Sequence, residues 1–371
     1  MEKQKQVQRL QSLDTLRGLD MFFIMGGASF FVALATLFPN GFFEAIAGQM
    51  HHVEWNGLTQ HDTIFPLFLF IAGISFPFSL EKQRMQGKTN ADIYKKIIRR
   101  GLTLVLFGAI YNGLLNFDFA NQRYASVLAR IGLAWMFGAL IFVNTRTITR
   151  VYITAVILIG YWLLLTFFPA PDGNGAGAFT MEGSLVGYID RMFLPGRLNN
   201  GIHDPEGILS TLPAIGTALL GMFTGEFIKL QKAGLSETQK VVYLAVSGCA
   251  LLIVGFLWSF FFPVIKHLWT SSFVCVVGGI SVLAFALFYY IVDVRECRGW
   301  TLFFRVIGMN SITIYMAQSF VNFTFTSNKL FGGLTGLMPE SAQPLVGAAG
   351  YIAVCWGFLY FLYRQRIFLK V

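Results

Sequence analysis

The chain has 371 residues, of which 55% are hydrophobic and only 13% are charged. A soluble domain of average composition carries about 25% charged residues, so the composition excludes an ordinary soluble enzyme. The formal net charge of +9 does not indicate a nucleic-acid partner. The basic residues lie in short loops between apolar runs, as the positive-inside rule expects.

Apolar runs of about twenty residues recur along the chain, which is the length of a transmembrane helix. The runs lack the apolar–polar alternation of barrel strands, so the predicted fold is all-α. We expect a polytopic bundle of about ten transmembrane helices that forms a single domain over residues 1–371. The predicted spans are 16–38, 62–81, 100–117, 126–144, 149–169, 209–229, 240–262, 270–292, 302–321 and 345–363. The first run has no small-residue cleavage site, so we expect no cleavable signal peptide.

The loops between these runs alternate in charge. Most of the 28 Lys and Arg residues lie in one set of loops, and the other set is poor in them. Because cytoplasmic loops carry the excess of basic residues, both termini are predicted to be cytoplasmic. The second set, which holds all five histidines, is then external, and its longest member, residues 170–208, is predicted to be a structured loop.

The stretch "HHVEWNGLTQHD" (residues 51–62) gathers three of the five histidines beside two carboxylates. A neutral imidazole is a good nucleophile or general base near neutral pH, and a carboxylate can fix its tautomer. Glu54 and Asp62 are both candidates for that carboxylate. The alternative is an ordinary polar loop with Trp55 as an interfacial anchor. The histidines lack the tight spacing of a zinc site, so no metal is expected.

The segment "SLDTLRGLDMFF" (residues 12–23) is a candidate for part of a cytoplasmic anion site. Ser12 or Asp14 can cap the first helix, and Arg17 follows one turn later on the face that also carries Asp20. The alternative is a cap followed by an Arg–Asp pair at the membrane interface.

The segment "GMNSITIYM" (residues 308–316) opens the ninth predicted helix with Asn310 and Ser311. Free backbone N–H groups at a helix start bind anions, and nearby basic residues would complement the phosphates of a nucleotide. Positive-inside charge is the alternative explanation for these residues, which are Arg99, Arg100, Arg295, Arg298, Arg305, Arg364 and Lys370.

Three further charged residues are predicted on the external side. Arg130 lies near the start of the fourth predicted helix, where it needs a carboxylate, a phosphate or water. Asp204 and Glu206 precede the sixth predicted helix in "IHDPEGILSTLPAIG". Helix capping is one interpretation of the two carboxylates. Recognition of a polar, sugar-like or amine substrate is the other.

Six segments occur in a fixed order along the chain: "SLDTLRGLDM", "HVEWNGLTQHDTIFPLFLFIAGIS", "GYIDRMFL", "DPEGILSTLPAIGTALLG", "GMNSITIYM" and "YRQRIFLKV". Together they resemble the heparan-α-glucosaminide N-acetyltransferase family of membrane acetyltransferases. The resemblance implies transfer of an acetyl group from cytoplasmic acetyl-CoA to the amine of a terminal glucosamine across the membrane.

The resemblance also assigns residues. The family's key histidine lies in His-x-x-Trp-Asn-Gly, which matches His52 and leaves His51 and His61 as bystanders. His52 is then a nucleophile or a general base, which the sequence leaves open. The expected catalytic set is His52, Asp62, Asn56 and Glu54, with Asn56 helping to hold the acetyl oxygen. The expected acetyl-CoA set is Arg17, Asp14, Arg100, Asn310, Ser311 and Lys370. The expected acceptor set is Trp55, Arg130, Asp204 and Glu206.

The chain departs from the lysosomal members of the family, which carry an extra lumenal segment and helix and an asparagine where Ala28 stands here. We therefore expect a bacterial-type catalytic core in the cytoplasmic (inner) membrane, with an amino-sugar acceptor and membrane lipid as partners and a homodimer left open. A sugar transporter without covalent chemistry and an O-acetyltransferase of envelope polysaccharide are the alternatives.

Overall fold

The computed structural model describes residues 10–230 and 234–369, and this part of the chain is helical without strands. Eight helices of the described residues are long and apolar enough to cross a membrane. They are α1 (Gln11–Phe22) continued by η1 (Phe23–Gly27) and α2 (Ala28–Leu37), α4 (Gln60–Met85), α6 (Val127–Asn144), α7 (Thr147–Phe167), α9 (Thr211–Lys229), α10 (Glu237–Trp258), α11 (Ser271–Phe288) with η3 (Tyr289–Val294), and α15 (Gln343–Arg364). The predicted polytopic all-α fold is confirmed.

The other two predicted spans, 100–117 and 302–321, differ from the helices that the structure has there. Helix α5 (Asn90–Tyr111) begins ten residues earlier than predicted, so its first turns carry the basic residues of the preceding loop. The run 302–321 is broken into α12 (Thr301–Met309) and α13 (Ser311–Phe320). Asn310 joins them with φ −125° and ψ 28°, outside the helical region. The break exposes a helix start inside the bundle.

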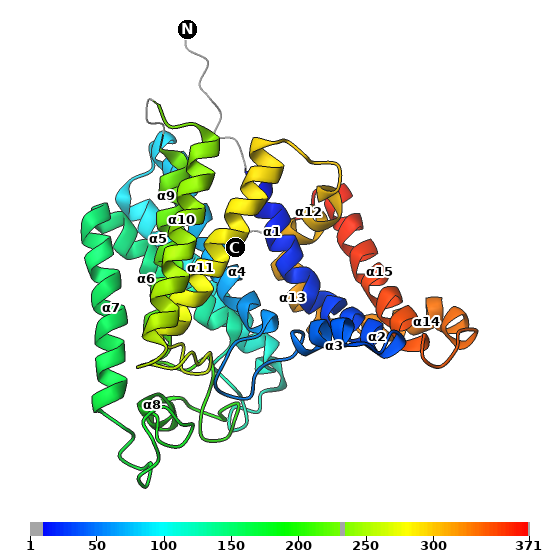
Figure 1. Ribbon diagram of the computed structural model, residues 1–371, viewed down its shortest axis with the longest axis horizontal. Coiled ribbons are helices and arrows are strands. Elements are labelled where there is room, and N and C mark those ends of the chain that lie inside the picture. Colours follow the sequence, from blue (N-terminus) through cyan, green and yellow to red (C-terminus); the bar gives the residue numbers. More distant parts are fainter. Residues whose placement is uncertain (1–9, 231–233, 370–371) are drawn as a thin grey trace.

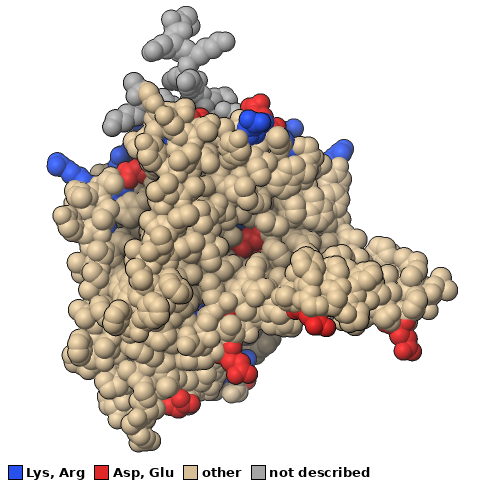
Figure 2. Space-filling model, viewed as in Figure 1, with Lys and Arg blue, Asp and Glu red and all other residues tan. Residues whose placement is uncertain are grey.

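The molecule has two chemically distinct ends (Figures 1 and 2). Lys and Arg gather at the upper end of the view, where α1 and α12 begin, which we call the basic end. The opposite end, which we call the histidine end, holds the start of α4 and the segment 168–210 with α8 (Leu185–Phe193). Helices α2, α3 (Gly41–Gly48) and α14 (Phe323–Gly336) project sideways at the level of this end.

The start of α1 is capped by a residue that is distant in sequence. The carboxylate of Asp293 accepts hydrogen bonds from the backbone N–H groups of Gln11 and Ser12, at 3.2 and 3.1 Å. The prediction that Ser12 or Asp14 caps this helix is therefore wrong. Both lie inside its first turn, and the residue at the cap position, Leu10, makes no side-chain cap. Arg17 pairs with Asp14 at 3.7 Å.

Helices α1 and α12 approach so closely that only glycine fits at their contact. A Cβ at Gly18 would lie 1.8 Å from the carbonyl oxygen of Phe304, and one at Gly308 would lie 1.9 Å from that of Asp14. Close backbone approach through small residues is a common way to join transmembrane helices. This contact fixes the break at Asn310 beside α1.

Replacing Gly308 by Ala tests the contact. The added methyl must separate two backbones, and overpacking of this kind costs about 1–3 kcal/mol. We expect a clearly lower melting temperature of the detergent-solubilised protein. Gly160→Ala in α7 is the matched control, because a Cβ there meets no heavy atom within 4 Å. Equal melting temperatures for the two variants would contradict the proposed contact.

Candidate active site

The imidazole of His52 is held by Asp62. Its Nδ1 lies 2.7 Å from Oδ1 of Asp62, and the His52 side chain is 54% exposed whereas the Asp62 side chain is 1% exposed. A carboxylate at this distance fixes the tautomer with a proton on Nδ1. The other ring nitrogen, Nε2, is then unprotonated and able to accept a proton or attack a carbonyl carbon.

Asp62 is itself fixed by the start of α4. Its Oδ2 accepts hydrogen bonds from the backbone N–H of Thr59 at 3.2 Å, the Thr59 hydroxyl at 2.9 Å and the backbone N–H of Val53 at 3.3 Å. Thr59 and Asp62 are the two partners of a capping box. The local sequence Thr59-Gln-His-Asp62 thus starts the helix and orients the carboxylate that holds His52.

Lys266 completes the group from a loop far away in the sequence. Its Nζ lies 3.1 Å from Oδ1 of Asp62 and 3.0 Å from Nδ1 of His52. Since Nδ1 donates its proton to Asp62, the Lys266 ammonium also donates to Asp62 and only adjoins the ring. Burial lowers the pKa of Lys266, and the Asp62 carboxylate opposes this effect. The backbone N–H of Gly57 donates to the carbonyl of Val264 at 2.9 Å, which ties the two loops together.

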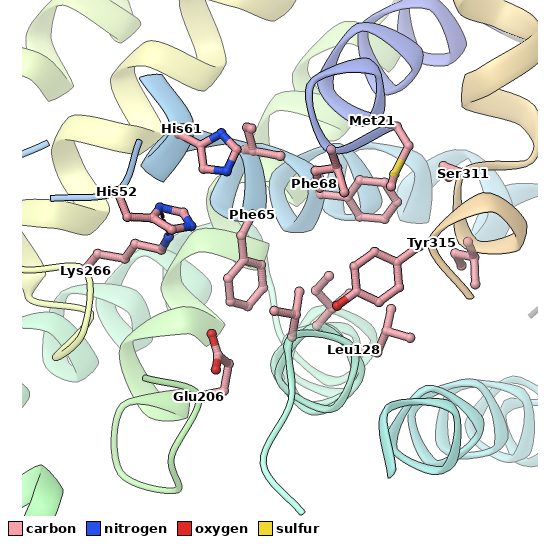
Figure 3. A pocket seen from close by; sticks show the side chains of 15 residues that line it. Met21, His52, His61, Phe65, Phe68, Leu128, Glu206, Lys266, Ser311 and Tyr315 are labelled. Atoms are coloured by element: carbon pink, nitrogen blue, oxygen red, sulfur yellow. Dashed lines mark hydrogen bonds between the residues drawn. The ribbon is translucent and has the colours of Figure 1, made fainter. Parts of the chain in front are cut away.

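A cavity of about 250 Å³ lies beside this group (Figure 3). Its wall at the histidine end is polar, with His52, His61, Lys266 and Glu206. The rest is mostly apolar and extends to Ser311, at the start of α13. The other lining residues are Met21, Ile24, Ile64, Phe65, Phe68, Val127, Leu128, Ile131, Ile312 and Tyr315. The cavity therefore joins the polar group at the histidine end to the broken helix inside the bundle.

Glu206 belongs to a second ionic cluster, which is centred on Arg123. The guanidinium of Arg123 donates to both carboxylate oxygens of Asp204, at 2.8 and 2.7 Å, and also to Glu206. Burial alone would raise the pKa of Asp204, but the Arg123 hydrogen bonds and charge more than offset this and lower it. The two predicted acceptor-side carboxylates are thus brought together, and only Glu206 lines the cavity.

Arg130 lies behind this cluster and is buried, with 1% of its surface exposed. It donates to the carbonyl of Gly207 at 3.3 Å and to the Ser210 hydroxyl, and its guanidinium lies 5.0 Å from the Trp269 ring centre. It does not line the cavity. Its contacts show that it holds the segment before α9 in place.

Trp55 is likewise placed behind the cavity wall. Its ring stacks on His267 at 5.2 Å and meets His203 edge-on at 5.5 Å, and its Nε1 donates to the carbonyl of Phe179 at 2.7 Å. Burial lowers the pKa of His203 to about 4, so this imidazole is neutral near pH 7. The cluster anchors the His52 loop to the segment 168–210.

The other two expected catalytic residues, Glu54 and Asn56, are exposed and do not line the cavity. Asp62, not Glu54, is the carboxylate that meets the imidazole. His51 is exposed, and His61 stands with its ring centre 4.5 Å from that of His52.

The residues predicted for acetyl-CoA are divided between two places. Ser311 lines the cavity beside His52, and Asn310 next to it is 2% exposed with no partner for Nδ2. Arg100 lies in a separate cavity of about 560 Å³ toward the basic end, with Lys96 and Arg99. Its guanidinium stacks 4.2 Å from the Trp135 ring centre, and its Nε has no hydrogen-bond partner.

The remaining residues predicted for acetyl-CoA are Arg17, Asp14 and Lys370. Arg17 donates to the Ser75 hydroxyl at 3.4 Å, which places it on α1 against α4, with Asp14 one turn away. Lys370 lies outside the described residues.

Lys266 and Arg123 were missed by sequence reasoning. Both are basic residues in loops that are otherwise poor in Lys and Arg, and each adjoins functional candidates only through the fold. A basic residue on the Lys- and Arg-poor side of a membrane protein was the available signal.

Comparisons with known proteins show the family of the chain. A family model described as "Heparan-alpha-glucosaminide N-acetyltransferase, catalytic" matches residues 9–254. The chain is 27% identical to the heparan-alpha-glucosaminide N-acetyltransferase of Homo sapiens and 26% identical to that of Mus musculus. These alignments cover 98% of this chain and 60% of each relative, so the chain spans about 60% of the relatives' length. Because the family model covers well over half of the sequence, the chain belongs to the heparan-α-glucosaminide N-acetyltransferase family.

Proposed function

We propose that this protein transfers the acetyl group of acetyl-CoA, bound from the basic end, to the amine of a glucosamine-type sugar at the histidine end. The observation that carries the proposal is the Asp62–His52 pair in the wall of a cavity that reaches into the bundle. The basic end is cytoplasmic in this proposal, by the positive-inside rule. The membrane is the bacterial inner membrane.

Two cavities support acetyl-CoA as the donor, and residues of α4 and α6 line both of them. The basic cavity offers Lys96, Arg99 and Arg100 to phosphates, and the unpartnered Nε of Arg100 is available for a charge-assisted hydrogen bond. The catalytic cavity offers an apolar path for an acyl-bearing arm and ends at His52. These residues fit a ligand with anionic groups at one end and a thioester at the other.

The reaction joins the acceptor nitrogen to the acetyl carbon and breaks the carbon–sulfur bond. The amine loses one proton, and the departing thiolate gains one. With Nδ1 held by Asp62, Nε2 of His52 serves either of two routes. It takes the proton from the attacking amine, or it attacks the acetyl carbon first and passes the acetyl group on. Detection of an acetylated His52 after incubation with acetyl-CoA alone separates the second route from the first.

The acceptor side is supported by Glu206. Its carboxylate lines the same polar wall of the cavity as Lys266 and is oriented by Arg123. A carboxylate in this place accepts hydrogen bonds from the hydroxyl and amine groups of a sugar. Asp204, bound by the same guanidinium, holds Arg123 in position.

His52→Ala should abolish acetyl transfer in proteoliposomes supplied with labelled acetyl-CoA outside and glucosamine inside, with no change in folding. Asp62→Asn should lower kcat about 100-fold or more, since it removes the charge that fixes the tautomer. Glu54→Gln is the control and should leave kcat within twofold. Normal turnover of His52→Ala, or movement of unmodified sugar without acetylation, would reject the enzyme in favour of the transporter.

Arg99→Gln and Arg100→Gln should each raise KM for acetyl-CoA about tenfold with a small effect on kcat. A hydrogen bond to a charged group is worth about 1.5–3 kcal/mol, and 1.4 kcal/mol is a factor of ten. Arg146→Gln is the matched control, because Arg146 is exposed and lies outside both cavities. If KM rose equally in all three variants, general surface charge, and not the basic cavity, would account for the binding of acetyl-CoA.

Lys266→Met should lower kcat/KM about tenfold or more, because it removes the hydrogen bond from an ammonium to the buried Asp62 carboxylate that holds His52. A hydrogen bond to a charged group is worth about 1.5–3 kcal/mol, and 1.4 kcal/mol is a factor of ten. Lys266→Arg keeps the charge and should retain most of the activity. Wild-type turnover of Lys266→Met would show that Lys266 has no part in holding the pair.

A further inference from the structure

A second cavity of the histidine end lies at the side of the bundle. It is a groove of about 690 Å³ between α2 and α15, within the range of about 300–1,000 Å³ that is typical of ligand sites. Small residues form much of its surface, which leaves room for a chain between the helices. The lining residues are Phe23, Ile24, Gly26, Ala28, Ser29, Val32, Ala33, Thr36, Met50, His51, His61, Pro344, Gly347 and Ala348.

The groove adjoins the catalytic cavity. Ile24 and His61 line both spaces, so these two side chains form the wall that separates them. The ring of His61 lies 4.5 Å from that of His52. A polar group at the His51 and His61 end of the groove is therefore one imidazole ring away from the residue proposed to act on the acceptor.

Two helices that are long and apolar enough to cross a membrane form the walls of this groove. They are Gln11–Leu37 and Gln343–Arg364, whose most apolar windows are only 33% and 22% buried within the protein. The helical path is interrupted beside the groove at Met25 and at Gly26, whose φ is +113°. The groove thus combines a mostly apolar surface between two candidate membrane spans with histidines at its inner end.

From this arrangement we propose that the acceptor is a lipid-anchored amino sugar that enters sideways from the bilayer. Its acyl or alkyl chain lies in the groove between α2 and α15, and its sugar passes Ile24 and His61 into the catalytic cavity. The anchor already lies in the bilayer, so its entry into the groove removes no apolar surface from water. An anchored acceptor instead has an advantage over a free sugar because the membrane concentrates it beside the groove. This inference rests on the proposed acetyl transfer and specifies its substrate class.

The test compares two acceptors in nanodiscs, hexadecyl 2-amino-2-deoxyglucopyranoside and free glucosamine. Gly347→Phe on α15 and Ser29→Phe on α2 add bulk to opposite walls of the groove. A Cβ at Gly347 meets no heavy atom within 4 Å, so the ring can be accommodated without a clash at its base. Gly357→Phe is the matched control on the same helix. Its Cβ also meets no atom within 4 Å, and it lies outside the groove.

The wild type should prefer the hexadecyl acceptor at least tenfold in kcat/KM. The two groove variants should lose this preference while acetylating free glucosamine at close to the wild-type rate, and Gly357→Phe should keep it. Equal use of both acceptors by wild type and groove variants would overturn the lipid-anchored acceptor and leave the acetyl transfer standing.

A binding measurement keeps the two proposals separable. A diazirine-bearing hexadecyl aminoglucoside should photolabel peptides of α2 and α15 in wild type and much less in Gly347→Phe, whether or not acetylation occurs. Labelling of the groove without any acetyl transfer would support the lipid site and reject the proposed enzyme. Labelling confined to other helices, or a groove closed by a second copy of the chain in cross-linking, would overturn the lipid site.

Discussion

One buried carboxylate at the start of α4 determines the geometry of the site. Asp62 is almost fully removed from solvent, and an ionised carboxylate there is tolerated only if its oxygens are satisfied. Thr59, Val53, His52 and Lys266 together provide the donors. Asp62 also lies at a helix start, where the backbone favours a negative charge. The same contacts that compensate for the burial of this charge also bring the His52 loop, the Lys266 loop and the imidazole together.

The helices that carry this point also connect it with the opposite end of the molecule. On α4, Phe68 lines the catalytic cavity and Phe76 lines the basic one. Eight residues separate them, which is about 12 Å along a helix. On α6 the corresponding residues, Ile131 and Trp135, are one turn apart. The two cavities therefore lie next to each other along α4 and α6. The helix break at Asn310 lies beside the cavity that His52 lines, because Ser311 is part of the wall of that cavity. This arrangement fits a reaction whose reactants arrive from different sides.

Much of the fold was predictable because each membrane span corresponds to one continuous run of apolar residues. The pairing of His52 with Asp62 was also within reach, since the two residues are ten apart in one loop and helix start. The capping of α1 by Asp293 and the position of Lys266 were not, because these partners are separated by more than 200 residues. The sequence did predict a helix start at Asn310 and Ser311, but not that it interrupts the apolar run 302–321. Hydropathy records the apolar character of 302–321 but not the backbone angles of one residue within it.

The charges around the mouth of the catalytic cavity bear on which form of the amine reacts. In the described part of the chain, the carboxylates there are paired with cations. Asp62 pairs with Lys266, and Asp204 and Glu206 pair with Arg123. Carboxylates that are already paired attract a bound ammonium weakly, and partial burial disfavours it further. The neutral amine is the nucleophilic form, and a neutral His52 is the form that takes a proton or attacks a carbonyl. In the acetyl transfer proposed above, both reacting groups thus meet uncharged, and the positive charge that appears during the transfer develops beside Asp62.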